Sequence, residues 1–183
     1  MGTSYYYFAA SLPMLAFEGA PPFSCESFLD DCKRIMQPKD FDVIYNVVDG
    51  TGTVDNSVAK AWQQFEDSFR NEAAWFRASE INRDPSDYMR GERSVDPLVV
   101  EALAQAAKSS DLFEGEKILD LARWGFLDTL VQGHFFDIEF LIVYAVKLKI
   151  LERYKHIESR KGREVFEAYK DFIAQQEIVN KVT

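Results

Sequence analysis

The stretch VAKAWQQFEDSFRNEAAWF, from Val58 to Phe76, gives the clearest indication of the fold. Its apolar residues recur at steps of four and three positions, at Val58, Trp62, Phe65, Phe69, Ala73 and Phe76. Residues three and four positions apart lie on the same side of an α-helix, so this period describes one apolar face. The pattern therefore predicts a long amphipathic helix from about Asp55 to Asn82.

The sequence on both sides predicts further helices, at about 24–36, 40–48, 97–109, 114–132, 138–160 and 165–173. The segment 40–48 alternates apolar and polar residues and also fits a strand. Helix is favoured there because no second alternating run could pair with it. Ser24, Asp96 and Asp137 stand at expected N-caps, and Gly133 at an expected C-cap. The predicted fold is all-α, with six or seven helices in one orthogonal or bundle-like domain over residues 1–183, and an exposed connector at 83–94.

Composition restricts the function. The net charge of −9 argues against a nucleic-acid partner, which would require a basic surface. Cys25 and Cys32 lie seven positions apart on one predicted helix, too far along its axis for a disulfide, which indicates reduced thiols and a cytoplasmic protein. The apolar run Phe140 to Val146 falls far short of the roughly 20 residues that span a bilayer, so no membrane insertion is expected.

The opening stretch YYYFAASLPML, Tyr5 to Leu15, does not fit a signal peptide. No Lys or Arg precedes it, Pro13 interrupts its apolar run, and no small-residue cleavage site follows. Tyrosine rings can be buried while the hydroxyl bonds a partner. The stretch is therefore predicted to be core or interface material, with Tyr5, Tyr6 and Tyr7 as candidate partner-binding residues.

Acidic residues gather in sequence around His134, at Glu114, Glu116, Asp120, Asp128, Asp137 and Glu139. Carboxylates with a histidine can bind a metal, but a di-iron bundle needs Glu-x-x-His twice, and Val131 and Arg153 stand three residues before the two histidines. No nucleophile–base motif or phosphate-binding loop is present either. We predict no catalytic, cofactor or metal site. A small helical metal-dependent enzyme that uses the acids near His134 is the alternative.

A basic face is predicted on the helix that begins near residue 138. Its members step by four and three positions, at Lys149, Arg153, His156, Arg160 and Arg163. This face could dock an acidic protein surface or lipid head groups. Docking an acidic protein would make the chain a generic interaction adaptor. The face could equally be a solvated rim with intrahelical Glu–Lys pairs.

The stretch FDIEFLIVYAVKLKILERYKHIESRKGREVFEAYKDFI, Phe136 to Ile173, resembles the C-terminal pattern of the V/A-type ATPase central-stalk subunit, called C in archaeal and d in eukaryotic enzymes. The matching features are Tyr144 to Lys147, the basic run Lys155 to Arg160, and the Lys161–Gly162 turn. YYYFAASLPML followed by SCESFLDDC is similar to that subunit's N-terminal tyrosine-bearing segment and first helix. Over nearly its whole length the chain also resembles an uncharacterised bacterial family encoded beside V-type ATP synthase subunits.

The resemblance implies an all-helical, non-enzymatic subunit that sits on the membrane rotor ring and receives the tip of the shaft. Its partners would be the stalk and membrane-ring subunits, which would place it in the cytoplasm, peripheral to the inner membrane through the complex. The chain departs from that subunit in being much shorter and in carrying Arg153-Tyr154-Lys155 where Asn-Leu-Arg is usual. The expected function is therefore that of a central-stalk or assembly subunit of a V-type ATP synthase.

Overall fold

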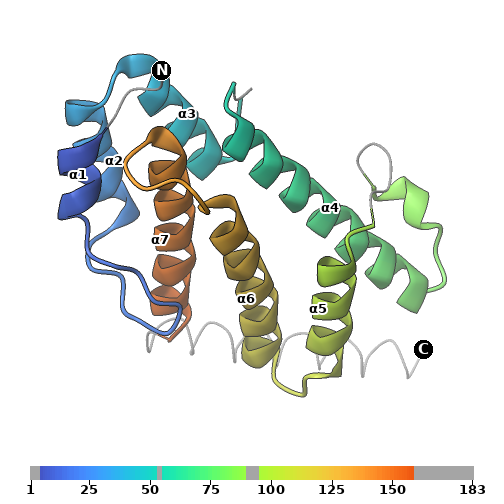
Figure 1. Cartoon of the computed structure of the whole chain (residues 1–183). Coiled ribbons are helices and arrows are strands. Elements are labelled where there is room, and N and C mark those ends of the chain that lie inside the picture. Colours follow the sequence, from blue (N-terminus) through green and yellow to red (C-terminus); the bar gives the residue numbers. More distant parts are fainter. Residues whose placement is uncertain (1–4, 53–54, 90–94, 159–183) are drawn as a thin grey trace.

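Helices account for all regular secondary structure in residues 5–52, 55–89 and 95–158, the part of the chain described by this computed structural model (Figure 1). They are α1 (Tyr6–Ser11), α2 (Cys25–Ile35), α3 (Pro38–Asp49), α4 (Ser57–Glu80), the short 3₁₀ turn η1 (Pro85–Asp87), α5 (Pro97–Lys108), α6 (Leu112–Leu130) and α7 (Ile138–Glu158). The all-α prediction is confirmed, and the ambiguous segment 40–48 is helical. The final helix expected at 165–173 lies outside the described residues.

The helix ends follow the expected capping chemistry. Ser24, Asp96 and Asp137 accept hydrogen bonds through their side chains from backbone N–H groups of the first turns of α2, α5 and α7. Pro38 occupies the first turn of α3. Proline is favoured in the first turn because the backbone N–H that it lacks would have no partner within the helix.

Two boundaries differ from the predictions. The opening stretch contains a short helix, α1, which the sequence pattern did not reveal. Helix α6 ends at Leu130 with Val131 as its C-cap, so the prediction of Gly133 as the C-cap was wrong. Gly133 instead adopts a positive φ of 84° in the turn that follows. Glycine tolerates that left-handed conformation without a Cβ clash, so the turn can lead directly into α7.

Helix α7 lies at the centre of the fold. Every residue from Leu141 to Val146 is buried, and the helix packs against α2, α3, α4 and α6. Figure 1 shows α7 standing between the α2–α3 pair and α6, while α4 crosses the other helices obliquely. Helix α5 pairs with α6 and also contacts α4. A helix that is apolar on all sides is stable in water only when it is enclosed in this way.

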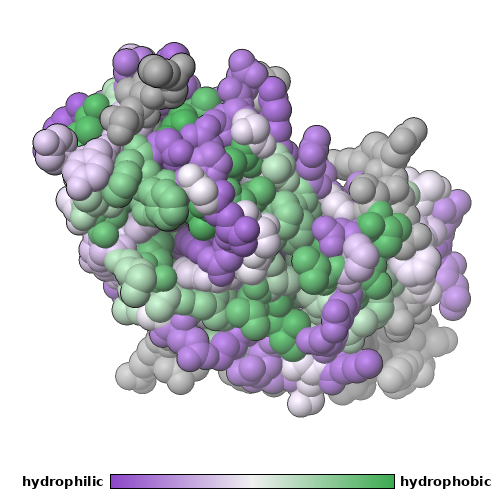
Figure 2. Space-filling view, viewed as in Figure 1, coloured by the Kyte–Doolittle hydropathy of each residue, from purple (hydrophilic) through white to green (hydrophobic). Residues whose placement is uncertain are grey.

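Both hydrophobic and hydrophilic residues reach the surface. On the face drawn in Figure 2, apolar patches are interrupted by polar side chains. Among the described residues, no helix has the length and apolarity that a membrane span requires. The described part of the connector, from Arg83 to Met89, includes η1 and is largely exposed.

Cys25 and Cys32 are buried, unoxidised thiols on α2, as predicted. Burial, followed by repulsion from Glu152, raises the pKa of Cys25 from 9.0 to about 11. Burial, followed by repulsion from Asp31, raises the pKa of Cys32 from 9.0 to about 12. Both thiols therefore stay protonated, and so unreactive, well above neutral pH.

These thiols should contribute to alkaline unfolding. Their stabilising contribution is complete below pH 9, where folded and unfolded thiols are both protonated. It is lost as the pH rises from 9 toward 11 and 12, because the unfolded thiols ionise first. Urea titrations at several pH values should show a Cys25→Ala/Cys32→Ala variant losing less stability over this range than the parent protein. If both proteins lost the same amount of stability between pH 9 and 12, the contribution assigned to the two thiols would be wrong.

Candidate functional site

A charged cleft of about 700 Å³ lies between the C-terminal end of α3 and the helices α4, α6 and α7. Five acidic and four basic side chains line it: Asp49, Glu66, Asp67, Asp120 and Glu152, with Arg70, Arg123, Lys149 and Arg153. Four separate helices supply these groups. The cleft therefore brings charged residues from four helices into one place.

Asp120 is the most buried charge in the cleft, with only 2% of its side chain exposed. Arg123 donates to one of its oxygens at 3.1 Å, and Arg153 of α7 donates to the other. Arg123 also donates to Glu66 of α4 at 2.7 Å, and its guanidinium lies 4.0 Å from the centre of the Phe69 ring. Asp120 thus links α6 to α7 directly and, through Arg123, to α4.

Two residues of the predicted basic face, Lys149 and Arg153, line this cleft. Lys149 donates to the carbonyl of Val48, near the C-terminal end of α3, where a positive charge is favoured. Burial is the largest single effect and would lower the pKa of Arg153. The attraction to Asp120, the hydrogen bond to it and the attraction to Glu116 and Tyr154 together outweigh burial, so the pKa is raised. Both cations therefore have partners inside the molecule. The side chain of His156, and Arg160 and Arg163, lie outside the described part.

The three candidate tyrosines have different environments. Tyr5 is buried, its hydroxyl donates to Asp40 at 2.5 Å, and its N–H donates to the carbonyl of Phe136 at 2.6 Å. Tyr6 and Tyr7 are exposed on α1. Tyr5 can therefore position the segment, while only Tyr6 and Tyr7 can touch a partner.

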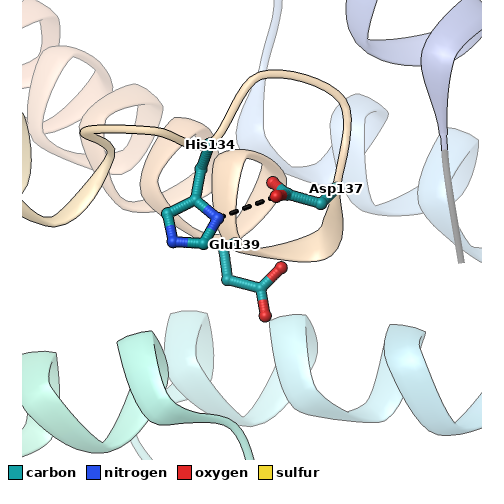
Figure 3. Close-up of side chains that lie close together, drawn as sticks. All are labelled: His134, Asp137 and Glu139. Carbon is teal, nitrogen blue, oxygen red and sulfur yellow. Dashed lines mark hydrogen bonds and ion pairs between the residues drawn. The ribbon is translucent and has the colours of Figure 1, made fainter. Parts of the chain in front are cut away.

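The acids that surround His134 in the sequence separate in the structure. Asp120 and Glu116 pair with Arg153, and Asp128 pairs with Lys147. Only Asp137 and Glu139 remain near His134, and possible ligand atoms of the three lie within 4.8 Å of one another (Figure 3). The six-acid cluster suggested by the sequence therefore reduces to a group of three residues.

Most polar atoms of this group already have partners. Asp137 bonds His134 through one oxygen, at 2.7 Å, and caps the N–H of Phe140 with the other, at 3.1 Å. Glu139 accepts from Asn56 at 2.9 Å. The group also stands at the N-terminus of α7, where the helix dipole favours anions and opposes a cation. These contacts favour a capping role that fastens the start of α7 to the N-cap of α4.

The chain was also compared with known proteins. A family model described as a protein of unknown function, DUF2764, matches residues 97–177, less than half of the chain. The match covers α5, α6 and α7, including Asp120, Arg123 and Arg153 of the cleft. No curated protein and no solved structure matches the chain.

The network around Asp120 was not predicted from the sequence. A signal for it exists, because Asp120, Trp124 and Leu127 share the buried face of α6 at steps of four and three. A carboxylate on an apolar face needs a partner, most often a cation that donates hydrogen bonds to it. The identity of that cation depends on how α4 and α7 pack, which the sequence pattern does not give.

Removing the Asp120 carboxylate should destabilise the fold markedly. Asp120→Ala leaves Arg123 and Arg153 without their shared partner, and breaking a buried ion pair costs about 3–5 kcal/mol. We expect the low end of that range because Arg153 is 44% exposed. The matched control is Asp128→Ala, which removes a 55% exposed acid that also pairs with α7. Asp128→Ala should lower the free energy of unfolding by less than about 1 kcal/mol. Similar urea midpoints for the two variants would refute the assignment.

The His134 group should not behave as a metal centre. Because its carboxylates already cap a helix and bond neighbouring side chains, adding Zn²⁺ or EDTA should leave the melting temperature unchanged. Differential scanning fluorimetry on the parent protein and on His134→Gln provides the measurement. A rise with Zn²⁺ that disappears in His134→Gln would show that the group binds metal.

Proposed function

We propose that the protein is a non-enzymatic central-stalk or assembly subunit of a V-type ATP synthase, docking between the shaft and the membrane ring. The observation that carries the proposal is the resemblance of Phe136 to Ile173 to the stalk subunit. That segment includes the whole of α7, the helix around which the fold is organised. It also falls inside the range matched by the family model.

The chemistry of the described surface supports a docking role better than a catalytic one. The acids considered as catalytic or metal-binding groups serve instead as helix caps and ion-pair partners. In the charged cleft, Arg123 pairs with both Glu66 and Asp120, so these two carboxylates join α4 to α6 and are not free to act as a base. A binding subunit needs a rigid scaffold of this kind and an exposed contact surface.

The predicted basic face would then act mainly through its later members. Lys149 and Arg153 hold internal partners, so their charge toward a partner protein is partly compensated. We infer that Arg160 and Arg163 carry more of the attraction to an acidic partner. In this proposal the C-terminal part of the chain meets one neighbour in the complex.

Co-purification tests the proposal directly. The full chain carrying an affinity tag, expressed from its own locus, should recover the stalk and membrane-ring subunits of the V-type ATP synthase in fixed ratios. Quantitative mass spectrometry measures this, and an Arg160→Glu/Arg163→Glu variant with an unchanged melting temperature should recover less of them. Recovery of the tagged chain without any ATP synthase subunit would overturn the proposal.

A further inference from the structure

Four aromatic rings form one exposed surface patch where α1 meets the loop between α6 and α7. They are Tyr6, Tyr7, Phe135 and Phe136, with 51%, 88%, 65% and 41% of their surfaces exposed. Ring centres lie 5.4 Å apart for Tyr6–Tyr7, 4.5 Å for Tyr6–Phe136 and 6.5 Å for Phe135–Phe136. Each ring therefore contacts the next one, and the four rings form one connected surface, here called the aromatic patch.

The aromatic patch is held in place from beneath. The buried Tyr5 bonds Asp40 of α3 through its hydroxyl and Phe136 through its N–H, so α1 is tied both to the core and to the loop. On the loop side, Asp137, the residue after Phe136, is held in place because it caps α7 and bonds His134 (Figure 3). A patch fixed in this way loses little conformational entropy when it binds a partner.

The charge beside the patch is mainly negative. Asp137 directly follows Phe136, Glu139 lies three residues after it, and Asp40 is bonded to Tyr5. Among the neighbours of these acids in the chain, Lys39 is an exposed cation, and His134 is bonded to Asp137. The chain as a whole carries a net charge of −9. Exposed rings beside carboxylates suit a partner that offers apolar side chains together with Lys or Arg.

The same charge argues against other occupants. An anionic lipid surface would be repelled by the carboxylates. A second copy would present its own acids to them, since a symmetric contact places identical patches face to face. A small ligand would need a concave site, whereas Tyr7 projects into solvent with 88% of its surface exposed.

We infer that the aromatic patch is a docking site for a basic, partly apolar segment of another protein. The rings of Tyr6 and Tyr7 face the cations of that segment, and Phe135 and Phe136 cover its apolar side chains. The inference rests on the proposed function only for the identity of the partner, which would be a subunit of the V-type ATP synthase. This docking site lies at the start of α7, whereas Arg153, one of the predicted basic residues, lies in its last two turns.

Photo-crosslinking in the full chain tests the inference. Benzoylphenylalanine replaces Tyr7 in the cells that make the protein, and the same group at Leu121 on α6, which is 54% exposed, serves as the control. Irradiation should give one discrete adduct from position 7 and none of the same mass from position 121. Mass spectrometry of the adduct should identify a peptide that contains Lys or Arg beside apolar residues.

Binding of that peptide, made synthetically, should then depend on the patch. We expect Tyr7→Ala to weaken binding by about tenfold or more without changing the melting temperature, because the ring is mostly exposed and contributes little to the core. Leu121→Ala should leave the affinity unchanged. Added salt should weaken binding, since the attraction is partly electrostatic.

The outcomes separate this inference from the proposed function. An adduct with an ATP synthase subunit through a basic segment supports both. An adduct with a basic segment of an unrelated protein supports the docking site and counts against the proposed function. The docking site would be overturned if no adduct formed or if the adduct joined two copies of the chain. It would also be overturned if Tyr7→Ala left binding unchanged, whatever co-purification shows.

Discussion

The constraint on which the rest of the structure depends is that the first half of α7 is apolar on every side. Six consecutive residues, Leu141 to Val146, are buried, so this part of the helix has no face that could meet water. Helices α2, α3, α4 and α6 supply the walls around it, and α5 reaches the fold through α6 and α4. The arrangement of the described helices follows from enclosing this one segment.

The second half of α7 uses charge to fix the helices that the first half gathers. Lys149 bonds a carbonyl at the C-terminal end of α3, and Glu152 accepts from the N–H of Cys25 at the N-terminal end of α2. Each charge thus meets the helix end of opposite dipole sign. Arg153 reaches Asp120 of α6 in the same stretch. Apolar burial alone does not set how neighbouring helices slide or rotate against each other, and these directional contacts restrict both.

The sequence predicted the elements well because its signals are local. The period of α4, the cap at Ser24 and the proline after Asp96 each act within a few residues, and the structure confirms them. Helix α1 escaped prediction because six residues are too few to show a helical period. The partners of Asp120 also escaped, because an ion pair between α6 and α7 depends on how distant segments pack. The predicted basic face was visible as a sequence pattern, but the internal bonds of Lys149 and Arg153 were not.

The two ends of α7 differ in chemistry, and two different surfaces are what the proposed connecting role would need. The helix has 21 residues and is about 30 Å long at 1.5 Å per residue. Its start adjoins exposed aromatic rings and carboxylates, and exposed Arg153 and Lys155 lie near its other end. A protein that meets one partner needs only one such surface. In the proposed role of a stalk subunit, α7 would connect these two surfaces through the core that encloses it.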